Sequence, residues 1–270
     1  MRQGCFYIQN QLSFFHFSYI IFETAPSESV ISSWTGDTGK VQLKAVATIL
    51  QRDTSAIVTL RDSGISSLAS LDKKKYASYQ GRFEMAIIKE MIKSDGGSGD
   101  IIEVLPQKLD CFDALLRRDA DATWVFMAWE GIQARRDHIL LNEFSISQSG
   151  VPYGYTPVLL AHPKYYDGQD ESKAEVLKSF LKISARAYLY ASSHPEEAAE
   201  ALMNISNHPS LFKHGREFVL QSQKYLSDGG HYLNSSNNWG TMESTRWSQF
   251  VDWLFENNCI DARDGSSLSR

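Results

Sequence analysis

An aromatic residue and a carboxylate stand side by side at Trp129-Glu130, directly after the short apolar run Asp121–Phe126. The run is rich in β-forming residues and predicts a buried strand. In open α/β sheets, ligands bind outside the carboxyl ends of the strands. Trp129 would supply an aromatic face, and Glu130 could accept a hydrogen bond from an amine. A core tryptophan beside an exposed glutamate explains this segment equally well on its own.

Further aromatic residues fall near the ends of other predicted strands. A flat heteroaromatic ligand needs such faces together with a few polar groups that fix its ring nitrogens. Any one of these tyrosines is better explained by packing, with its hydroxyl at the surface. Their collection at strand ends is what favours a ligand site. The residues concerned are Tyr76, Tyr79, Trp124, Trp129, Tyr153 and Tyr155.

Motifs for covalent or metal catalysis are not found in the sequence. There is no Gly-x-Ser-x-Gly elbow and no His-Glu-x-x-His pair, so the residues predict no catalytic group and no metal site. Cys5, Cys111 and Cys259 are far apart and form no Cys-x-x-Cys, which suits a reducing compartment. Cys111 falls on the inward side of a predicted helix, where a cysteine is usually inert.

The composition is that of an ordinary soluble protein: 270 residues, 43% hydrophobic and 22% charged. The net charge of −5 and the lack of a basic run argue against a nucleic-acid partner. No apolar run reaches the roughly 20 residues that a membrane helix needs. Residues 12–22 could belong to a signal peptide cleaved after Ala25, but a strand explains their aromatic content better.

The elements that would position these residues alternate along the chain. Lys75 to Arg136 is predicted as β-α-β-α-β-α, the pattern of parallel strands with crossover helices. A helix from Pro26 to about Trp34 precedes it, followed by strand character at 43–51 and 56–60, as two strands or one bent strand. Two more strands, at 138–146 and 158–161, follow the alternation.

From Ser172 onward the sequence is helical. Ser172-x-x-Glu175 predicts a capping box at the start of the first helix. His194-Pro195-Glu196-Glu197 predicts the start of a second helix. A last helix places Trp247, Phe250, Val251 and Leu254 on one buried face.

Seven segments, in this order, resemble the thiamine pyrimidine synthase-like family, which belongs with the nitrate- and sulfonate-type substrate-binding proteins (periplasmic binding protein-like). The resemblance spans about residues 20 to 262, and its specificity lies in the ordered set rather than in one motif. The segments are Ala25-Pro26-Ser27-Glu28-Ser29, Asp62-Ser63-Gly64-Ile65, Tyr79-Gln80-Gly81-Arg82-Phe83-Glu84, Asp121–Phe126, Trp129-Glu130-Gly131, Val151–Tyr155 and Pro195–Ala199.

The resemblance implies a two-lobed α/β fold of type II, with parallel sheets flanked by helices and a ligand clamped by hinge closure. Lobe one would combine residues 19–61 with 150–262, and lobe two would be residues 62–149. Residues 1–18 would be an unrelated segment and residues 263–270 a tail. The family normally has another strand–helix–strand unit before Ala25, so we expect an N-terminally shortened chain with an incomplete lobe one.

The implied function is non-catalytic binding of a thiamine-pyrimidine precursor, of formylaminopyrimidine or hydroxymethylpyrimidine type, in thiamine biosynthesis or salvage. No cofactor is expected. The family's synthases use a lysine that holds pyridoxal phosphate, a histidine and a cysteine-rich run, and the matching segments here offer Ala25, Ser29 and Pro152-Tyr153-Gly154-Tyr155-Thr156 instead. The ligand-binding residues implied are Trp129, Glu130, Tyr79, Gly81, Tyr153, Tyr155, Ser27 and Glu28.

Two alternatives remain open at this stage. The first is a thiamine pyrimidine synthase that uses pyridoxal phosphate, and the second is a degenerate remnant that binds no ligand. The expected partner is a small pyrimidine, with no nucleic acid and no membrane span. A cytoplasmic or organellar location is favoured over secretion, because the signal peptide pattern is poor.

Overall fold

The chain divides into two units in the computed structural model, which describes residues 22–35, 43–206 and 209–260. Unit 1 comprises Met1–Asp53 and Gly154–Arg270, and unit 2 comprises Thr54–Tyr153. The sequence predicts that the first part of lobe one ends at residue 61. The structure instead places β3 (Ser55–Leu60) in unit 2, because both of its edges are hydrogen-bonded within the sheet of that unit.

Unit 2 is built on a five-stranded mixed sheet. β4 lies parallel to both of its neighbours, whereas β3 is antiparallel to β6 and β7. The predicted alternation from Lys75 to Arg136 is present, and its three strands are the parallel part of the sheet. In spatial order the strands are β5 (Ile102–Val104), β4 (Lys75–Ala77), β6 (Ala122–Phe126), β3 and β7 (Leu141–Ser145).

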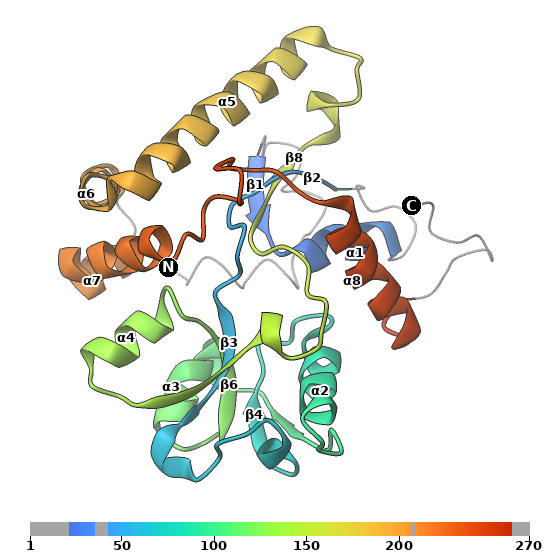
Figure 1. The fold of residues 1–270 in the computed structure, drawn as a ribbon, viewed down its shortest axis with the longest axis vertical. Coiled ribbons are helices and arrows are strands. Elements are labelled where there is room, and N and C mark those ends of the chain that lie inside the picture. Colours follow the sequence, from blue (N-terminus) through green and yellow to red (C-terminus); the bar gives the residue numbers. More distant parts are fainter. Residues whose placement is uncertain (1–21, 36–42, 207–208, 261–270) are drawn as a thin grey trace. The chain divides into compact units, whose positions relative to one another are not determined.

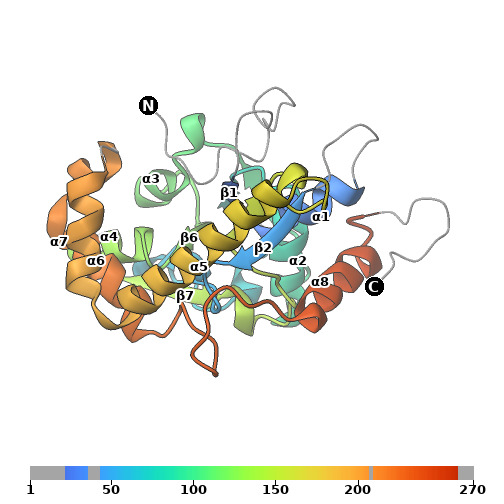
Figure 2. The same cartoon turned by 90° about the horizontal axis from the view of Figure 1, so that it is seen from above.

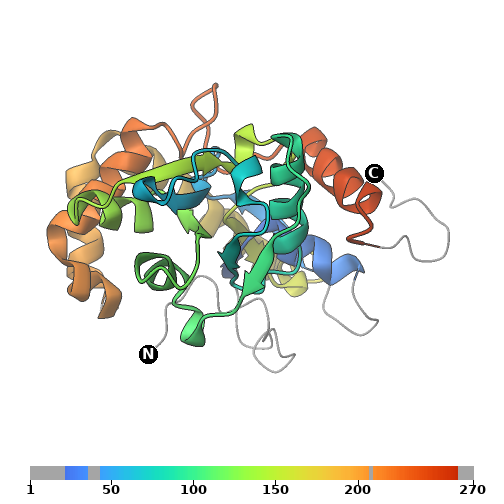
Figure 3. The same ribbon diagram turned by 90° about the horizontal axis from the view of Figure 1, so that it is seen from below.

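The helices of unit 2 are α2 (Glu84–Ser94), α3 (Cys111–Leu116) and α4 (Glu130–Arg136). α2 and α3 lie on opposite sides of the strands β4 and β6 (Figures 1 and 3). α2 buries the apolar face that its sequence spacing predicts, with Ile87, Ile88, Met91 and Ile92 all fully buried. The sheet of unit 2 is therefore covered by helices on both sides.

Unit 1 contains a smaller sheet of three strands in the order β1 (Phe22–Ala25), β8 (Val158–Ala161) and β2 (Lys44–Thr48). Both outer strands are antiparallel to β8. The predicted strand at residues 12–22 falls outside the described residues except for Phe22. The strand character at 43–51 and 56–60 belongs to two strands, β2 and β3, in different units.

The helices of unit 1 are α1 (Ser27–Thr35), α5 (Glu171–Ser193), α6 (Pro195–Ile205), α7 (Pro209–Asp228) and α8 (Ser244–Glu256). α5 lies across the small sheet (Figure 2), where Leu181, Ala185 and Tyr188 pack on Ala47 and Leu159. Short 3₁₀ helices occupy Arg61–Ser63, Ala69–Leu71, Gln107–Leu109, Ile146–Gln148 and Pro163–Tyr165. No described helix has the length and apolar character needed to cross a membrane.

The capping box predicted at the start of α5 is wrong. Asp170 is the N-cap residue instead, and its side chain accepts hydrogen bonds from the backbone N–H groups of Ser172 and Lys173. The helix therefore begins one residue before Ser172, and Glu175 forms an ion pair with Lys178 rather than reaching back. Both Asp and Ser are good N-cap residues, and the earlier of the two is used here.

Candidate functional site

The loop between β4 and α2 in unit 2 carries two of the predicted ligand residues, Tyr79 and Gly81. Its backbone bends at Gln80, which has a left-handed φ of 61°. The loop is held by one side chain: the Glu84 carboxylate accepts hydrogen bonds from the backbone N–H of Tyr79 at 3.2 Å and of Gly81 at 2.8 Å. The Ser78 hydroxyl donates to the same carboxylate at 3.3 Å. This short loop is therefore ordered around an internal anion.

Glu84 is itself buried, and it has a buried partner on β4. The Tyr76 hydroxyl donates to Glu84 Oε1 at 2.7 Å. Burial raises the pKa of Glu84, while the hydrogen bond from Tyr76 and those from the loop oppose this shift. Burial, followed by the charge of Glu84, raises the pKa of Tyr76 as well. Glu84 lies within the family-like segment Tyr79–Glu84, but it is not among the ligand-binding residues that the resemblance implies.

The turn between β6 and α4 carries two more of the predicted ligand residues, the consecutive pair Trp129 and Glu130. The backbone N–H of Trp129 donates to the Phe126 carbonyl at 2.8 Å and closes the turn. The Glu130 carboxylate accepts from the Phe126 N–H at 3.0 Å. Both side chains are half-buried. Glu130 therefore folds back over the end of β6. The alternative interpretation, a core tryptophan beside an exposed glutamate, expects this side chain to extend into solvent instead.

The charge of Glu130 acts on the Tyr79 hydroxyl, although the two residues belong to different loops. The pKa of Tyr79 is raised well above its ordinary value, first by burial and then by the charge of Glu130. Cys111, Glu84 and Asp110 raise it further. Three carboxylates thus act on one phenol hydroxyl. Burial also raises the pKa of the Glu130 carboxyl.

Cys111 borders this cluster as a protonated thiol. Its Sγ donates to the Ser78 carbonyl at 3.4 Å, and the side chain is fully buried. Burial, followed by the charge of Glu84, raises the pKa of the Cys111 thiol to about 12. A nucleophilic cysteine needs a lowered pKa, so this side chain acts as a small buried donor, in agreement with the inert role expected for it.

Tyr153 is placed differently from the other unit 2 candidates. It is buried, and its ring meets Trp124 edge-on with the ring centroids 5.6 Å apart. This geometry is that of a core aromatic pair. Tyr153 therefore contributes to the packing of unit 2.

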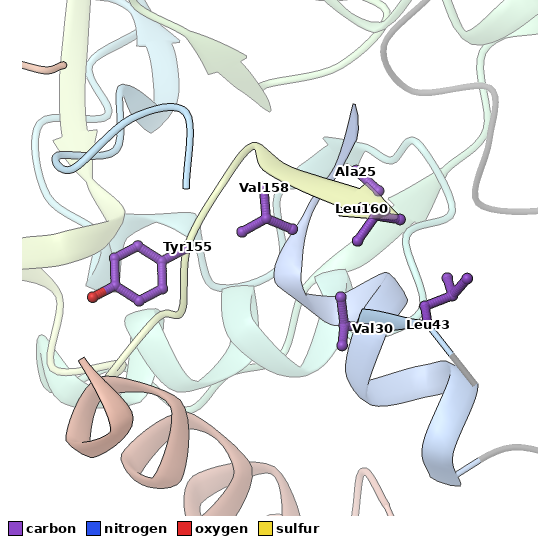
Figure 4. Close-up of a cluster of buried hydrophobic side chains, with 6 residues drawn as sticks. All are labelled: Ala25, Val30, Leu43, Tyr155, Val158 and Leu160. Atoms are coloured by element: carbon purple, nitrogen blue, oxygen red, sulfur yellow. The ribbon is translucent and has the colours of Figure 1, made fainter. Parts of the chain in front are cut away.

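In unit 1, the predicted residues Ser27 and Tyr155 bind each other. The Ser27 N–H donates to the Tyr155 carbonyl at 2.9 Å, and the Tyr155 N–H donates to Ser27 Oγ at 3.1 Å. The Tyr155 hydroxyl accepts from the Glu243 N–H at 3.0 Å. Tyr155 also belongs to the core cluster with Ala25, Val30, Leu43, Val158 and Leu160 (Figure 4).

Glu28 follows Ser27 in the first turn of α1 and is also buried. Its position suits the positive end of the helix dipole. The backbone and hydroxyl groups of Ser27 and Tyr155 are used in packing, so these two residues shape unit 1. Across the described residues, no group of three or more His, Cys, Asp or Glu side chains has the geometry of a metal site.

A family model described as "NMT1/THI5 like" matches residues 31–198, more than half of the chain. No curated protein matches the sequence.

Solved structures match the fold over most of the chain. The alkanesulfonate-binding protein SsuA from Xanthomonas axonopodis pv. citri, bound to MOPS, superposes with a TM-score of 0.63 at 12% identity, covering 91% of this chain and 78% of that one. The periplasmic aliphatic sulphonate-binding protein SsuA from Escherichia coli gives 0.61 at 12% identity, with coverages of 90% and 77%. The desulfurization enzyme DSZB gives 0.57 at 12% identity, with coverages of 93% and 84%. The fold is thus the two-lobed type II fold of periplasmic binding proteins.

Proposed function

Because the chain belongs to the NMT1/THI5-like family, we propose that it is a non-catalytic binding protein for a small thiamine-pyrimidine precursor. The ligand would be of formylaminopyrimidine or hydroxymethylpyrimidine type. The family-like segments and the type II binding-protein fold support ligand binding as the general activity. The arrangement of Tyr79, Trp129 and Glu130 in unit 2 supports the chemical class of the ligand.

The observation that carries the proposal is the placement of Glu130, whose carboxylate accepts from the Phe126 N–H at the end of β6 directly beside Trp129. Trp129 offers an aromatic face, and the adjacent Glu130 offers a carboxylate. A flat ring that carries amine donors can use both. An aminopyrimidine has both features: its ring packs on an aromatic face, and its exocyclic amine donates to a carboxylate. A hydrogen bond to a charged group contributes about 1.5–3 kcal/mol, enough to select such a ligand.

The same surroundings disfavour the ligand class named for the structural neighbours. One neighbour is bound to MOPS and another is described as binding aliphatic sulphonates. A sulfonate near Tyr79 would meet the charges of Glu130, Glu84 and Asp110. Like charges at close range in a partly buried site cost several kcal/mol. We therefore assign this chain a neutral or cationic ligand rich in hydrogen-bond donors.

Binding without chemistry is favoured by the state of the nearest nucleophile. The thiol of Cys111, with its pKa raised to about 12, stays protonated at neutral pH. Glu130 and Tyr79 can hold and orient a ring, and neither needs to transfer a proton for that purpose. The unit 2 cluster therefore serves recognition.

A thermal-shift screen tests this proposal. A specific ligand raises the melting temperature by mass action, so formylaminopyrimidine and hydroxymethylpyrimidine should stabilise the protein, whereas ethanesulfonate should not. Glu130→Gln should lose most of the stabilisation. Glu103→Gln, which changes an exposed glutamate on β5 of the same unit, is the matched control. Stabilisation by ethanesulfonate alone would refute the proposal, and an aldimine absorbance with pyridoxal phosphate would favour the synthase.

A further inference from the structure

The loop before α2 is held by the side chain of the first residue of that helix. Helix N-termini present unpaired N–H groups and a partial positive charge, which makes them ready binding places for anions. Here the Glu84 carboxylate turns back and accepts from the N–H groups of Tyr79 and Gly81 in the preceding loop. The hydroxyls of Tyr76 and Ser78 complete the set.

These four donors match the two oxygens of one carboxylate. Oε1 accepts from the Tyr76 hydroxyl and the Tyr79 N–H, and Oε2 accepts from the Ser78 hydroxyl and the Gly81 N–H. An ionised carboxylate has only acceptor sites, so it satisfies every one of these groups. An amide of the same shape would turn an N–H₂ group toward donors. The arrangement therefore suits a carboxylate better than an amide side chain.

We propose that the Glu84 carboxylate is a built-in anion that occupies the loop before α2 and excludes external sulfonate, phosphate and carboxylate groups from it. Glu84 is accordingly a specificity-determining and positioning residue: it shapes the loop that carries Tyr79 and Gly81. The exclusion of anions stands on the geometry of Glu84 alone, whereas its consequence for the ligand class rests on the proposed function.

A second observation supports the same conclusion from the other side of the loop. The charges of Glu130 and Asp110, in addition to that of Glu84, raise the pKa of the Tyr79 hydroxyl. An anion arriving at this loop would therefore meet carboxylates on neighbouring elements as well as the Glu84 carboxylate that the loop already binds. A ligand with amine donors would meet acceptors instead.

The experiment removes the internal anion and offers an external one. In Glu84→Ala, formate or acetate should enter the vacated position and accept from the same N–H and hydroxyl groups. We expect saturable thermal stabilisation of this variant, with a rise in melting temperature of at least about 2 °C, and no comparable rise in the wild type. Glu90→Ala, a glutamate of the same helix outside the loop, is the matched control and should behave as the wild type.

Two outcomes would overturn the inference. One is a folded Glu84→Ala protein that gains no more anion stabilisation than Glu90→Ala. The other needs no variant: saturable stabilisation of the wild type by formate or acetate would show that the loop accepts external anions while Glu84 is in place. A failure of pyrimidine binding would instead count against the proposed function and leave the anion measurements unaffected, so the two failures can be told apart.

Discussion

The Arg246 guanidinium lies over the Tyr155 ring, 4.1 Å from its centroid, and donates hydrogen bonds to two backbone carbonyls of unit 1. The acceptors are Gln51, just before the chain enters unit 2, and Gly154, just after it returns. One side chain of α8 thus holds the unit 1 ends of both connecting segments. Only a planar group with several donors can stack and bridge in this way.

Replacing Arg246 by lysine should therefore destabilise unit 1 although the charge is kept. Lysine cannot stack as a plane or reach both carbonyls, so we expect a loss of about 1–3 kcal/mol in unfolding free energy. Chemical denaturation followed by circular dichroism measures it. Arg186→Lys, at an exposed position on α5, is the control and should cost little. Equal stability of the two variants would show that the stacking and bridging of Arg246 contribute nothing.

Gly154 is required by a close approach between the returning segment and α1. A Cβ at this position would lie 2.3 Å from Ser27 Oγ and 3.0 Å from Phe250 Cδ1. We expect Gly154→Ala to destabilise the protein by about 1–3 kcal/mol through overpacking. Ser27→Ala removes the closest atom, so the double variant should lose less than the sum of the two single losses. Additive losses, measured by denaturation of all four proteins, would contradict this contact.

The pairing of Tyr76 with Glu84 predicts a cost for removing one hydroxyl. Tyr76→Phe leaves the buried carboxylate with one donor fewer, and we expect a loss of about 1–3 kcal/mol in unfolding free energy. Tyr188→Phe is a suitable comparison, because Tyr188 is half-buried and packs its ring on Trp239. If the two substitutions cost the same, the hydroxyl of Tyr76 has no special role in holding Glu84.

Glu130 predicts a particular pH dependence of stability. Burial raises the pKa of its carboxyl above the ordinary value of 4.5 in the folded protein. The folded state then holds this proton more tightly than the unfolded state, so the contribution of Glu130 is most favourable below pH 4.5 and falls as pH rises through the raised pKa.

We therefore expect the unfolding free energy of Glu130→Gln to decline less steeply than that of the wild type above pH 4.5. Denaturation curves at a series of pH values provide the comparison, with Glu103→Gln expected to run parallel to the wild type. A slope unchanged by Glu130→Gln would mean that this carboxyl is not held in a shifted state.

Local patterns in the sequence predict much of unit 2. The alternation of strands and helices from Lys75 to Arg136 is readable because apolar spacing and glycine turns act over a few residues. The strand end at Trp129-Glu130 and the loop at Tyr79 follow from the same patterns. The structure adds that the Glu130 carboxylate turns back onto the Phe126 N–H, which the sequence pattern does not contain.

Some residues with a role in the structure are not evident from the sequence, because they act through hydrogen bonds to residues of other elements. Glu84 looks like a helix-starting glutamate, and only the fold shows that Tyr76 and the loop donate to it. Arg246 contacts Gln51 and Gly154, which lie 195 and 92 residues away in the sequence. Tyr155, like Tyr79, is an aromatic residue near a predicted strand end. Its hydroxyl and its backbone N–H, however, are hydrogen-bonded within unit 1.

The most direct test of the account is a calorimetric titration of formylaminopyrimidine into the wild type, Trp129→Ala, Glu130→Gln and Glu103→Gln. We predict saturable binding to the wild type and to Glu103→Gln, and an affinity at least about tenfold weaker in the other two variants, as expected for a lost charged hydrogen bond or ring contact. Absence of saturable heat with the wild type, or equal affinity in all four proteins, would contradict the assignment of this ligand to the Trp129–Glu130 turn.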